Sequence, residues 1–218
     1  MNKLIAQGAE SKLFLVNNKI LKNRFQKKYR IKEIDERLRK SRTRREAKIL
    51  EKLQNIHFPS PRLLKSAWKS KISGINPFDD EKENLEMEYI KGKLIKDILE
   101  KSDYVKLSRD IGSKVAILHN NSIIHGDLTT SNMILDKKNK IFVIDFGLGF
   151  FFHKIEDKAT DLHLLKEALE SKHYKIWEKC YNAVLKIYEK KAINGKDIAK
   201  RLKVVESRGR YKGKKWMY

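Results

Sequence analysis

The chain has 218 residues and a mass of 25.7 kDa, a length that suits one large domain or two small lobes. Hydrophobic residues make up 40% of it, which is enough for a buried core and excludes a wholly disordered chain. Lysine and arginine number 50 against 28 acidic residues, and the formal net charge of +22 favours a polyanionic partner such as nucleic acid or nucleotide phosphate.

The single cysteine, Cys180, excludes an internal disulfide and a four-cysteine zinc site, and favours a reducing compartment. The first residues lack the apolar stretch of a secretory signal, and no stretch approaches the roughly 18 apolar residues of a membrane span. We therefore expect a cytoplasmic protein with no membrane partner.

The first 90 residues predict a small sheet with one main helix. Apolar spacing and turn residues indicate strands over 4–6, 12–21, 63–68 and 85–90 and a helix over 34–53. The first two strands are expected to join at a turn around Gly8, and Asn17-Asn18 within the second is a turn signal. The basic stretch Arg39 to Arg45 is expected to interrupt the helix, and Ser70 to Asn84 is expected to be a polar loop.

The pattern becomes helical after Gly92. One apolar stripe predicts a helix over 104–118, a second predicts a core-facing helix over 174–188, and a short apolar strand is expected over 141–144. The aromatic residues of the second stripe are Tyr174, Trp177, Tyr181 and Tyr188. The sequence thus predicts an α+β protein with a sheet lobe over 1–90 and a mainly helical lobe over 91–218.

Two segments hold most of the net positive charge. Residues 22–48 carry about +9 and residues 201–218 about +6, whereas a surface that is merely solvated interleaves its charges more evenly. The clustering favours a polyanion or partner site. The second segment is expected to be mobile until it is bound.

The string that carries most chemistry is His125-Gly126-Asp127-Leu128-Thr129-Thr130-Ser131-Asn132, which Asp145-Phe146-Gly147 follows after a turn and a strand. Phosphoryl transfer needs a carboxylate beside the attacking oxygen and metal ligands beside the phosphates. Asp127 suits the first task, and Asn132 and Asp145 supply the oxygen ligands that Mg²⁺ prefers. The ordered combination predicts an ATP- and Mg²⁺-dependent phosphotransferase.

These motifs resemble the protein-kinase superfamily, with His-Gly-Asp in place of His-Arg-Asp. The missing arginine and the absence of serine, threonine and tyrosine from Phe146 to Ala159 predict no phosphorylation switch in this segment. No Ala-Pro-Glu follows, so the peptide-docking platform of conventional kinases is expected to be absent. The resemblance implies a two-lobed, minimal protein-kinase-like fold.

The resemblance assigns further ATP-binding residues in the first lobe. Lys22 matches the lysine that grips the phosphates, and Glu46 matches the helical glutamate that orients it. Backbone groups of Glu88 and Ile90 match the hinge that meets adenine. The turn that would cradle phosphate is formed by Gly8, Ala9, Glu10 and Ser11, with one glycine instead of three.

Four strings resemble more narrowly the small atypical serine/threonine kinase/ATPase of the KEOPS complex: Gln7-Gly8-Ala9-Glu10-Ser11, Arg42-Thr43-x-x-Glu46-Ala47, Glu156-Asp157-Lys158-Ala159-x-Asp161-Leu162 and Glu206-Ser207-Arg208-Gly209-Arg210. The resemblance implies action beside a metal-containing transferase and accessory subunits that form threonylcarbamoyl-adenosine in tRNA. It also implies that Asp161 braces the catalytic loop and that Arg208 and Arg210 contact partner or RNA.

Other functions stay open at this point. Antibiotic and choline phosphotransferases share the His-Gly-Asp…Asn pattern, although this chain lacks their helical insertions. RIO kinases are closer in size but usually carry an additional N-terminal helical module. A non-catalytic RNA-binding scaffold would suit the charge, yet every catalytic position is filled. Mg²⁺-dependent ATP turnover with and without tRNA separates these alternatives.

Overall fold

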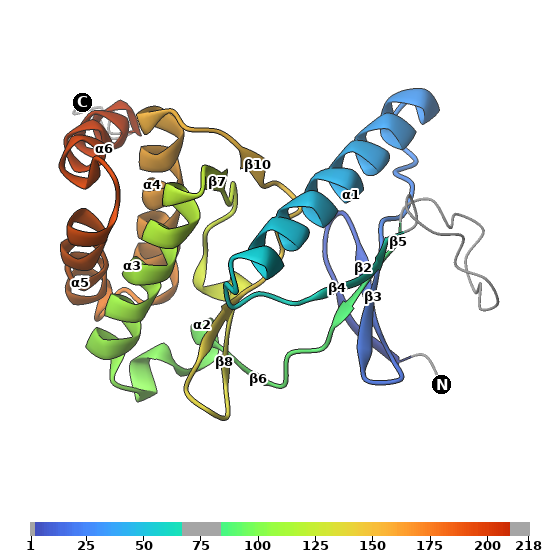
Figure 1. Cartoon of the computed structure of the whole chain (residues 1–218), viewed down its shortest axis with the longest axis horizontal. Coiled ribbons are helices and arrows are strands. Elements are labelled where there is room, and N and C mark those ends of the chain that lie inside the picture. Colours follow the sequence, from blue (N-terminus) through green and yellow to red (C-terminus); the bar gives the residue numbers. More distant parts are fainter. Residues whose placement is uncertain (1–2, 67–83, 210–218) are drawn as a thin grey trace, which may run out of the picture. The chain divides into compact units, whose positions relative to one another are not determined.

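A computed structural model describes residues 3–66 and 84–209 of the chain (Figure 1). Contacts between residues divide the chain into two compact units. The first unit comprises Met1–Gly92 and Asp136–Leu148, and the second comprises Lys93–Leu135 and Gly149–Tyr218. The first unit therefore includes Asp136–Leu148, a segment that a division of the chain at residue 90 would assign to the second lobe. No helix in the described ranges is long and apolar enough to cross a membrane.

The first unit contains a five-stranded antiparallel sheet in the order β1-β2-β3-β5-β4. The strands are β1 (Lys3–Gln7), β2 (Lys12–Val16), β3 (Lys19–Asn23), β4 (Leu63–Ser66) and β5 (Asn84–Glu88). The segment 12–21 is not one strand but a hairpin of β2 and β3, and the turn signal Asn17-Asn18 marks its turn. Asn17 and Asn18 turn the chain at φ angles of 47° and 61°, a left-handed conformation that asparagine tolerates.

The helix α1 (Lys32–Asn55) lies beside this sheet as one long helix (Figure 1). The expected interruption at Arg39 to Arg45 is wrong. Arg39 is buried with its Nε atom 2.7 Å from Asp35 Oδ2, and Thr43 is also buried, so the basic stretch contributes to the inner face. Ala47 packs with Ile20, Leu85 and Met87 in a core cluster that joins helix and sheet.

The first unit also contains β9 (Ile141–Val143), which confirms the strand expected over 141–144 to within a residue. A turn precedes it, in which Asp136 Oδ1 accepts hydrogen bonds from the backbone N–H groups of Lys138 and Lys140, both at 2.8 Å. The Val143 N–H donates to Pro59 O at 3.0 Å. This bond anchors the strand that leads into Asp145.

The second unit is mainly helical, and α3, α4, α5 and α6 gather together in it (Figure 1). Its elements are β6 (Gly92–Leu94), α2 (Ile95–Ile98), α3 (Tyr104–Asn120), β7 (Ile123–Ile124), β8 (Met133–Asp136), β10 (Phe150–Phe151), α4 (Ile155–Lys172), α5 (Trp177–Lys191) and α6 (Gly195–Gly209). Strands β7 and β10 pair antiparallel. A Cβ atom at Gly112 of α3 would lie 2.4 Å from Val184 O, so this glycine lets α3 and α5 approach closely.

The predicted helix over 104–118 is confirmed by α3, which Asp103 caps by accepting a hydrogen bond from the Lys106 N–H at 3.0 Å. In the second apolar stripe, Tyr181 and Tyr188 are buried, but Tyr174 precedes α5 and is 68% exposed. The expected mobile tail is wrong for 201–209, which belong to α6, where Leu202 is buried. The rest of that segment lies outside the described residues.

Candidate active site

Three predicted site residues meet in the first unit around Lys22. The side chain of Lys22 on β3 is buried, and its Nζ atom donates to Glu46 Oε1 on α1 at 2.7 Å and to Asp145 Oδ1 at 2.8 Å. A buried ammonium group is costly unless it is paired, so the two carboxylates make this position tenable. The structure therefore brings Lys22, Glu46 and Asp145 together.

Arg24 is a member of the same cluster that the sequence pattern does not single out. Its Nη2 atom contacts Glu46 Oε2, and its side chain is 4% exposed. A Cβ atom at Gly147 would lie 2.9 Å from Arg24 Nη2 and 3.0 Å from Asp145 Oδ1, so glycine leaves the space that these groups use. The sequence does carry one signal for Arg24. It stands two residues after Lys22, and residues two apart in an extended chain point to the same side.

Asp145 has an unusual backbone and a strongly acidic side chain. Its φ angle is 61°, and its Oδ1 atom accepts from the Gly147 N–H at 3.2 Å. Burial by itself would raise the pKa of this carboxyl group, but Lys22, the Gly147 N–H and Arg24 outweigh it and lower the pKa from 3.8 to about 2. Asp145 is therefore ionised at neutral pH, which suits the metal-ligand role predicted for it.

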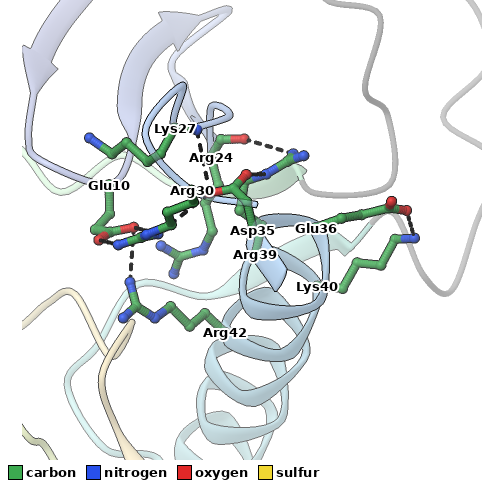
Figure 2. A network of polar contacts seen from close by, with 9 residues as sticks. All are labelled: Glu10, Arg24, Lys27, Arg30, Asp35, Glu36, Arg39, Lys40 and Arg42. Carbon is green, nitrogen blue, oxygen red and sulfur yellow. Dashed lines mark hydrogen bonds and ion pairs between the residues drawn. The ribbon is translucent and has the colours of Figure 1, made fainter. Parts of the chain in front are cut away.

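The predicted phosphate loop is tied to α1 through Glu10 (Figure 2). The Gly8 N–H donates to Ser11 O at 2.9 Å and closes the turn. Glu10 Oε1 lies 2.9 Å from Arg30 Nη2, and Glu10 Oε2 lies 2.9 Å from Arg42 Nη1. The hydrogen bond from Arg30 and the contact with Arg42 lower the pKa of Glu10. Of the four loop residues, Gly8 and Ala9 are exposed and Ser11 is buried.

The two predicted hinge residues stand at the end of β5. The Glu88 N–H donates to Arg62 O at 2.9 Å, and Glu88 Oε2 accepts from Arg62 Nε at 3.2 Å. This N–H group already has a hydrogen-bond acceptor, so any hydrogen bond of the Glu88 backbone to adenine would use its carbonyl group. Ile90 is buried two residues later.

The predicted catalytic loop lies in the second unit, between β7 and β8. Asp127 is exposed, and Asn132 Nδ2 donates to both Asp127 O and Asp127 Oδ2 at 2.8 Å. The amide group of Asn132 thus closes the loop and fixes the Asp127 carboxylate. Because Nδ2 makes these bonds, the amide oxygen of Asn132 is the atom suited to a cation.

Asp161 on α4 holds the backbone just before Asp127. Its Oδ2 atom accepts from the His125 N–H at 2.6 Å, and its Oδ1 atom accepts from the Gly126 N–H at 2.8 Å. Burial would raise the pKa of Asp161, but the hydrogen bonds from His119 and from the His125 N–H lower it. The structure thus gives Asp161 the contacts expected of a residue that braces this loop.

The sequence-predicted Arg208 lies on α6, where its Nη1 atom is 2.5 Å from Glu156 Oε1 of α4. Arg201, earlier on the same helix, also contacts Glu156. This ion pair joins α6 to the start of α4 and engages one of the two arginines expected to meet a partner. The other, Arg210, lies outside the described residues.

The donor atoms suit Mg²⁺, which prefers oxygen ligands and keeps several waters. Asp145 is ionised, and among the described residues no hydrogen bond reaches its Oδ2 atom. Asn132 presents an amide oxygen. Within the described ranges no three His, Cys, Asp or Glu side chains form a group that could hold a metal ion.

Comparisons with known proteins agree with this geometry. The protein kinase domain family matches residues 1–177. A solved Rio2 kinase from Chaetomium thermophilum, crystallised as an ADP/Mg²⁺-phosphoaspartate complex, matches with a TM-score of 0.60 over 95% of this chain and 70% of that one, at 15% sequence identity. The fold is therefore protein-kinase-like, with an N-terminal antiparallel sheet and a mostly helical C-terminal part.

Sequence relatives are more specific. The KEOPS complex subunit Bud32 of Pyrococcus abyssi is 40% identical over 230 residues, which cover 99% of both chains. A probable serine/threonine-protein kinase BUD32 homologue of Archaeoglobus fulgidus is 35% identical over 94% of both chains. A probable bifunctional tRNA threonylcarbamoyladenosine biosynthesis protein of Methanobrevibacter smithii is 39% identical, and this chain spans 37% of its length. The chain belongs to the protein kinase domain family and, within it, to the family of KEOPS complex subunit Bud32.

Proposed function

We propose that this chain is the ATP-dependent kinase/ATPase subunit of a KEOPS-type complex that forms threonylcarbamoyl-adenosine in tRNA. The observation that carries the proposal is the buried Lys22, held by Glu46 and Asp145 at 2.7 and 2.8 Å. A lysine so placed serves to grip phosphate, and the full-length similarity to Bud32 of Pyrococcus abyssi supports the choice of complex.

Each residue has a role in this proposal. Lys22 binds the ATP phosphates, while Glu46 fixes the direction of its ammonium group. Asp145 and Asn132 would hold Mg²⁺, which when bound neutralises the charge of the phosphate oxygens.

Asp127 receives the proton of the attacking oxygen, which belongs to a serine, a threonine or a water molecule. The exposed carboxylate can accept that proton because Asn132 already fixes its direction. Adenine is proposed to meet the backbone at Glu88 and Ile90, and the Gly8–Ser11 turn to cover the phosphates.

We further propose that the partners are the transferase subunit and accessory subunits, that tRNA is reached through the complex, and that the protein acts in the cytoplasm. The names of its relatives and the basic composition support the partners. The single cysteine supports a reducing compartment.

The experiment is Mg²⁺-dependent ATP turnover by the purified chain, measured alone, with tRNA, and with the co-purified transferase subunit. The proposal expects turnover that requires Mg²⁺ and changes when the transferase is added. A chain that binds tRNA without binding ATP would instead be a non-catalytic scaffold. Phosphorylation of an aminoglycoside or choline in the same assay would favour a small-molecule phosphotransferase.

A further inference from the structure

Tyr188 of α5 places a hydroxyl group inside the second unit, beside His119 of α3. Both side chains are buried, with 0% of either residue exposed. The Tyr188 hydroxyl lies 2.7 Å from His119 Nδ1, and the two rings meet edge to face with centroids 5.4 Å apart. A tyrosine in an apolar stripe packs as a core residue, and this one has a defined polar partner as well.

The surroundings of His119 determine which of its nitrogen atoms carries the proton. Its Nε2 atom lies 3.3 Å from Asp161 Oδ2. Asp161 has a lowered pKa and is ionised, so it can only accept. Nε2 therefore carries the proton. Burial lowers the pKa of His119 despite the opposing effect of Asp161, and the nearby ammonium group of Lys158 lowers it further.

A neutral His119 protonated at Nε2 has a lone pair at Nδ1, and the Tyr188 hydroxyl is the donor that meets it. Burial raises the pKa of Tyr188, and the negative charge of Asp161 raises it further, so the hydroxyl keeps its proton. The hydrogen bonds thus run in one direction, from the Tyr188 O–H to His119 and from His119 Nε2–H to Asp161. Reversing either one would leave a buried acceptor facing another acceptor.

This chain of bonds ends at the catalytic loop. Asp161 accepts from the N–H groups of His125 and Gly126, directly before Asp127. Gly126 has a φ angle of 77°, which glycine adopts without steric penalty but does not prefer over other conformations, so the hydrogen bonds to Asp161 help to select this shape of the loop. We propose that Tyr188 is a positioning residue whose hydroxyl fixes the tautomer of His119 and thereby the hold of Asp161 on the backbone before Asp127. This inference rests on the proposed function.

The test is Tyr188→Phe, which keeps the ring and removes only the hydroxyl. Tyr181→Phe is the matched control, because Tyr181 is also a buried residue of α5 but its hydroxyl donates to Leu162 O at 3.3 Å, away from His119. Two quantities are measured in both variants and the wild type: steady-state ATP turnover, and the tautomer and pKa of His119 by ¹⁵N-detected NMR.

Tyr188→Phe is expected to lower kcat by about tenfold while the KM for ATP stays within twofold, because the Lys22 cluster is untouched. It is also expected to populate the Nδ1-protonated tautomer of His119 and to raise its pKa, since the donor that opposed protonation is gone. Tyr181→Phe is expected to leave kcat, tautomer and pKa as they are.

An unchanged kcat or an unchanged tautomer in Tyr188→Phe would overturn the inference. So would a wild-type His119 that is charged or carries its proton on Nδ1 at neutral pH, a measurement that depends on no variant. If the wild type turns over no ATP while its His119 is protonated at Nε2, the proposed function has failed, and with it the catalytic part of this inference; the hydrogen-bond direction then stands alone.

Discussion

Lys22 is the residue on which the candidate nucleotide site depends. Removing its ammonium group by Lys22→Met leaves Glu46 in contact with Arg24, so the fold is expected to survive with a lower melting temperature. The affinity for Mg²⁺-ATP should fall at least about tenfold, the loss of one charge-assisted hydrogen bond. Isothermal titration calorimetry of wild type and variant measures this affinity.

Lys19→Met is the matched control for that variant. Lys19 lies on the same strand, but it is half exposed and pairs with Glu86 at 2.7 Å. Its removal should leave ATP affinity unchanged. Equal ATP affinity in the Lys22→Met variant and the wild type would mean that Lys22 does not grip the phosphates.

Asp145 gives the fold a defined acid sensitivity. Its pKa is lowered from 3.8 to about 2, so its ionised form stabilises the fold above pH 3.8, and this contribution is lost as the pH falls towards 2. Asp145→Asn removes the charge but tolerates the φ angle of 61°. The difference in melting temperature between wild type and variant should therefore be largest above pH 4 and shrink below it. A difference that stays constant from pH 5 to pH 2 would contradict this.

At the scale of elements, Glu10 connects the phosphate loop to α1. Arg42, which holds Glu10, stands one helical turn before Glu46, which holds Lys22. The same helix therefore fixes both parts of the proposed nucleotide site in the first unit. Glu10→Arg is expected to raise the KM for ATP several-fold with little change in kcat, because a mobile loop binds phosphate less well.

The charge swap Glu10→Arg with Arg42→Glu tests whether this pair causes the effect. It should bring the KM part of the way back to the wild-type value, since the two charges again oppose one another. Arg44→Glu, an exposed change on the same helix, serves as the control and should have no effect. A double variant no better than Glu10→Arg alone would show that the ion pair does not position the loop.

Residues could be predicted from the sequence where a motif and its order along the chain identify them. Lys22, Glu46 and Asp145 follow a kinase-like order, and their contacts agree with it. For Arg24 the only signal is its position two residues after Lys22, and the roles of His119 and Tyr188 could not be predicted, because they depend on which elements pack together. His119 and Tyr188 are distant in sequence, and only the close approach of α3 and α5 joins them.

The misjudged elements have physical explanations too. The basic stretch of α1 continues as a helix because acidic partners receive its inward arginines, which composition alone does not show. The segment 201–209 is helical because Leu202 has a core to enter and Arg201 has Glu156 as a partner. Periodicity was sufficient for α3, where a long apolar stripe and an aspartate cap coincide.

At the scale of the whole molecule, some basic residues pair with carboxylates of their own unit, and others lie in the C-terminal segment. Lys22, Arg24, Arg30, Arg39 and Arg42 all pair with carboxylates in the first unit. Part of the basic cluster at 22–48 is thus engaged by three carboxylates of the same unit, those of Glu10, Asp35 and Glu46. The C-terminal residues after α6, with Arg210 and three lysines, are a second source of positive charge for the proposed RNA contact.

Deleting residues 210–218 should therefore leave ATP turnover unchanged and flatten the salt dependence of tRNA binding. Each RNA phosphate that the shortened chain no longer neutralises lowers the slope of log affinity against log salt by about 0.7 to 0.9. The measurement is a salt titration of tRNA binding for the full chain and the shortened chain, with the transferase subunit present and absent. An unchanged slope and unchanged affinity would assign these residues no part in RNA binding.

The most direct test of the proposed phosphotransferase is the turnover of Mg²⁺-ATP by the wild type and by Asp127→Asn. The asparagine can still accept the hydrogen bond from Asn132 Nδ2, so the loop should keep its shape and ATP should still bind. It cannot take up a proton, so kcat is expected to fall at least about a hundredfold, the lower end of what a general base contributes. Turnover by Asp127→Asn at the wild-type rate would contradict the assignment of this chain as an Asp127-dependent phosphotransferase.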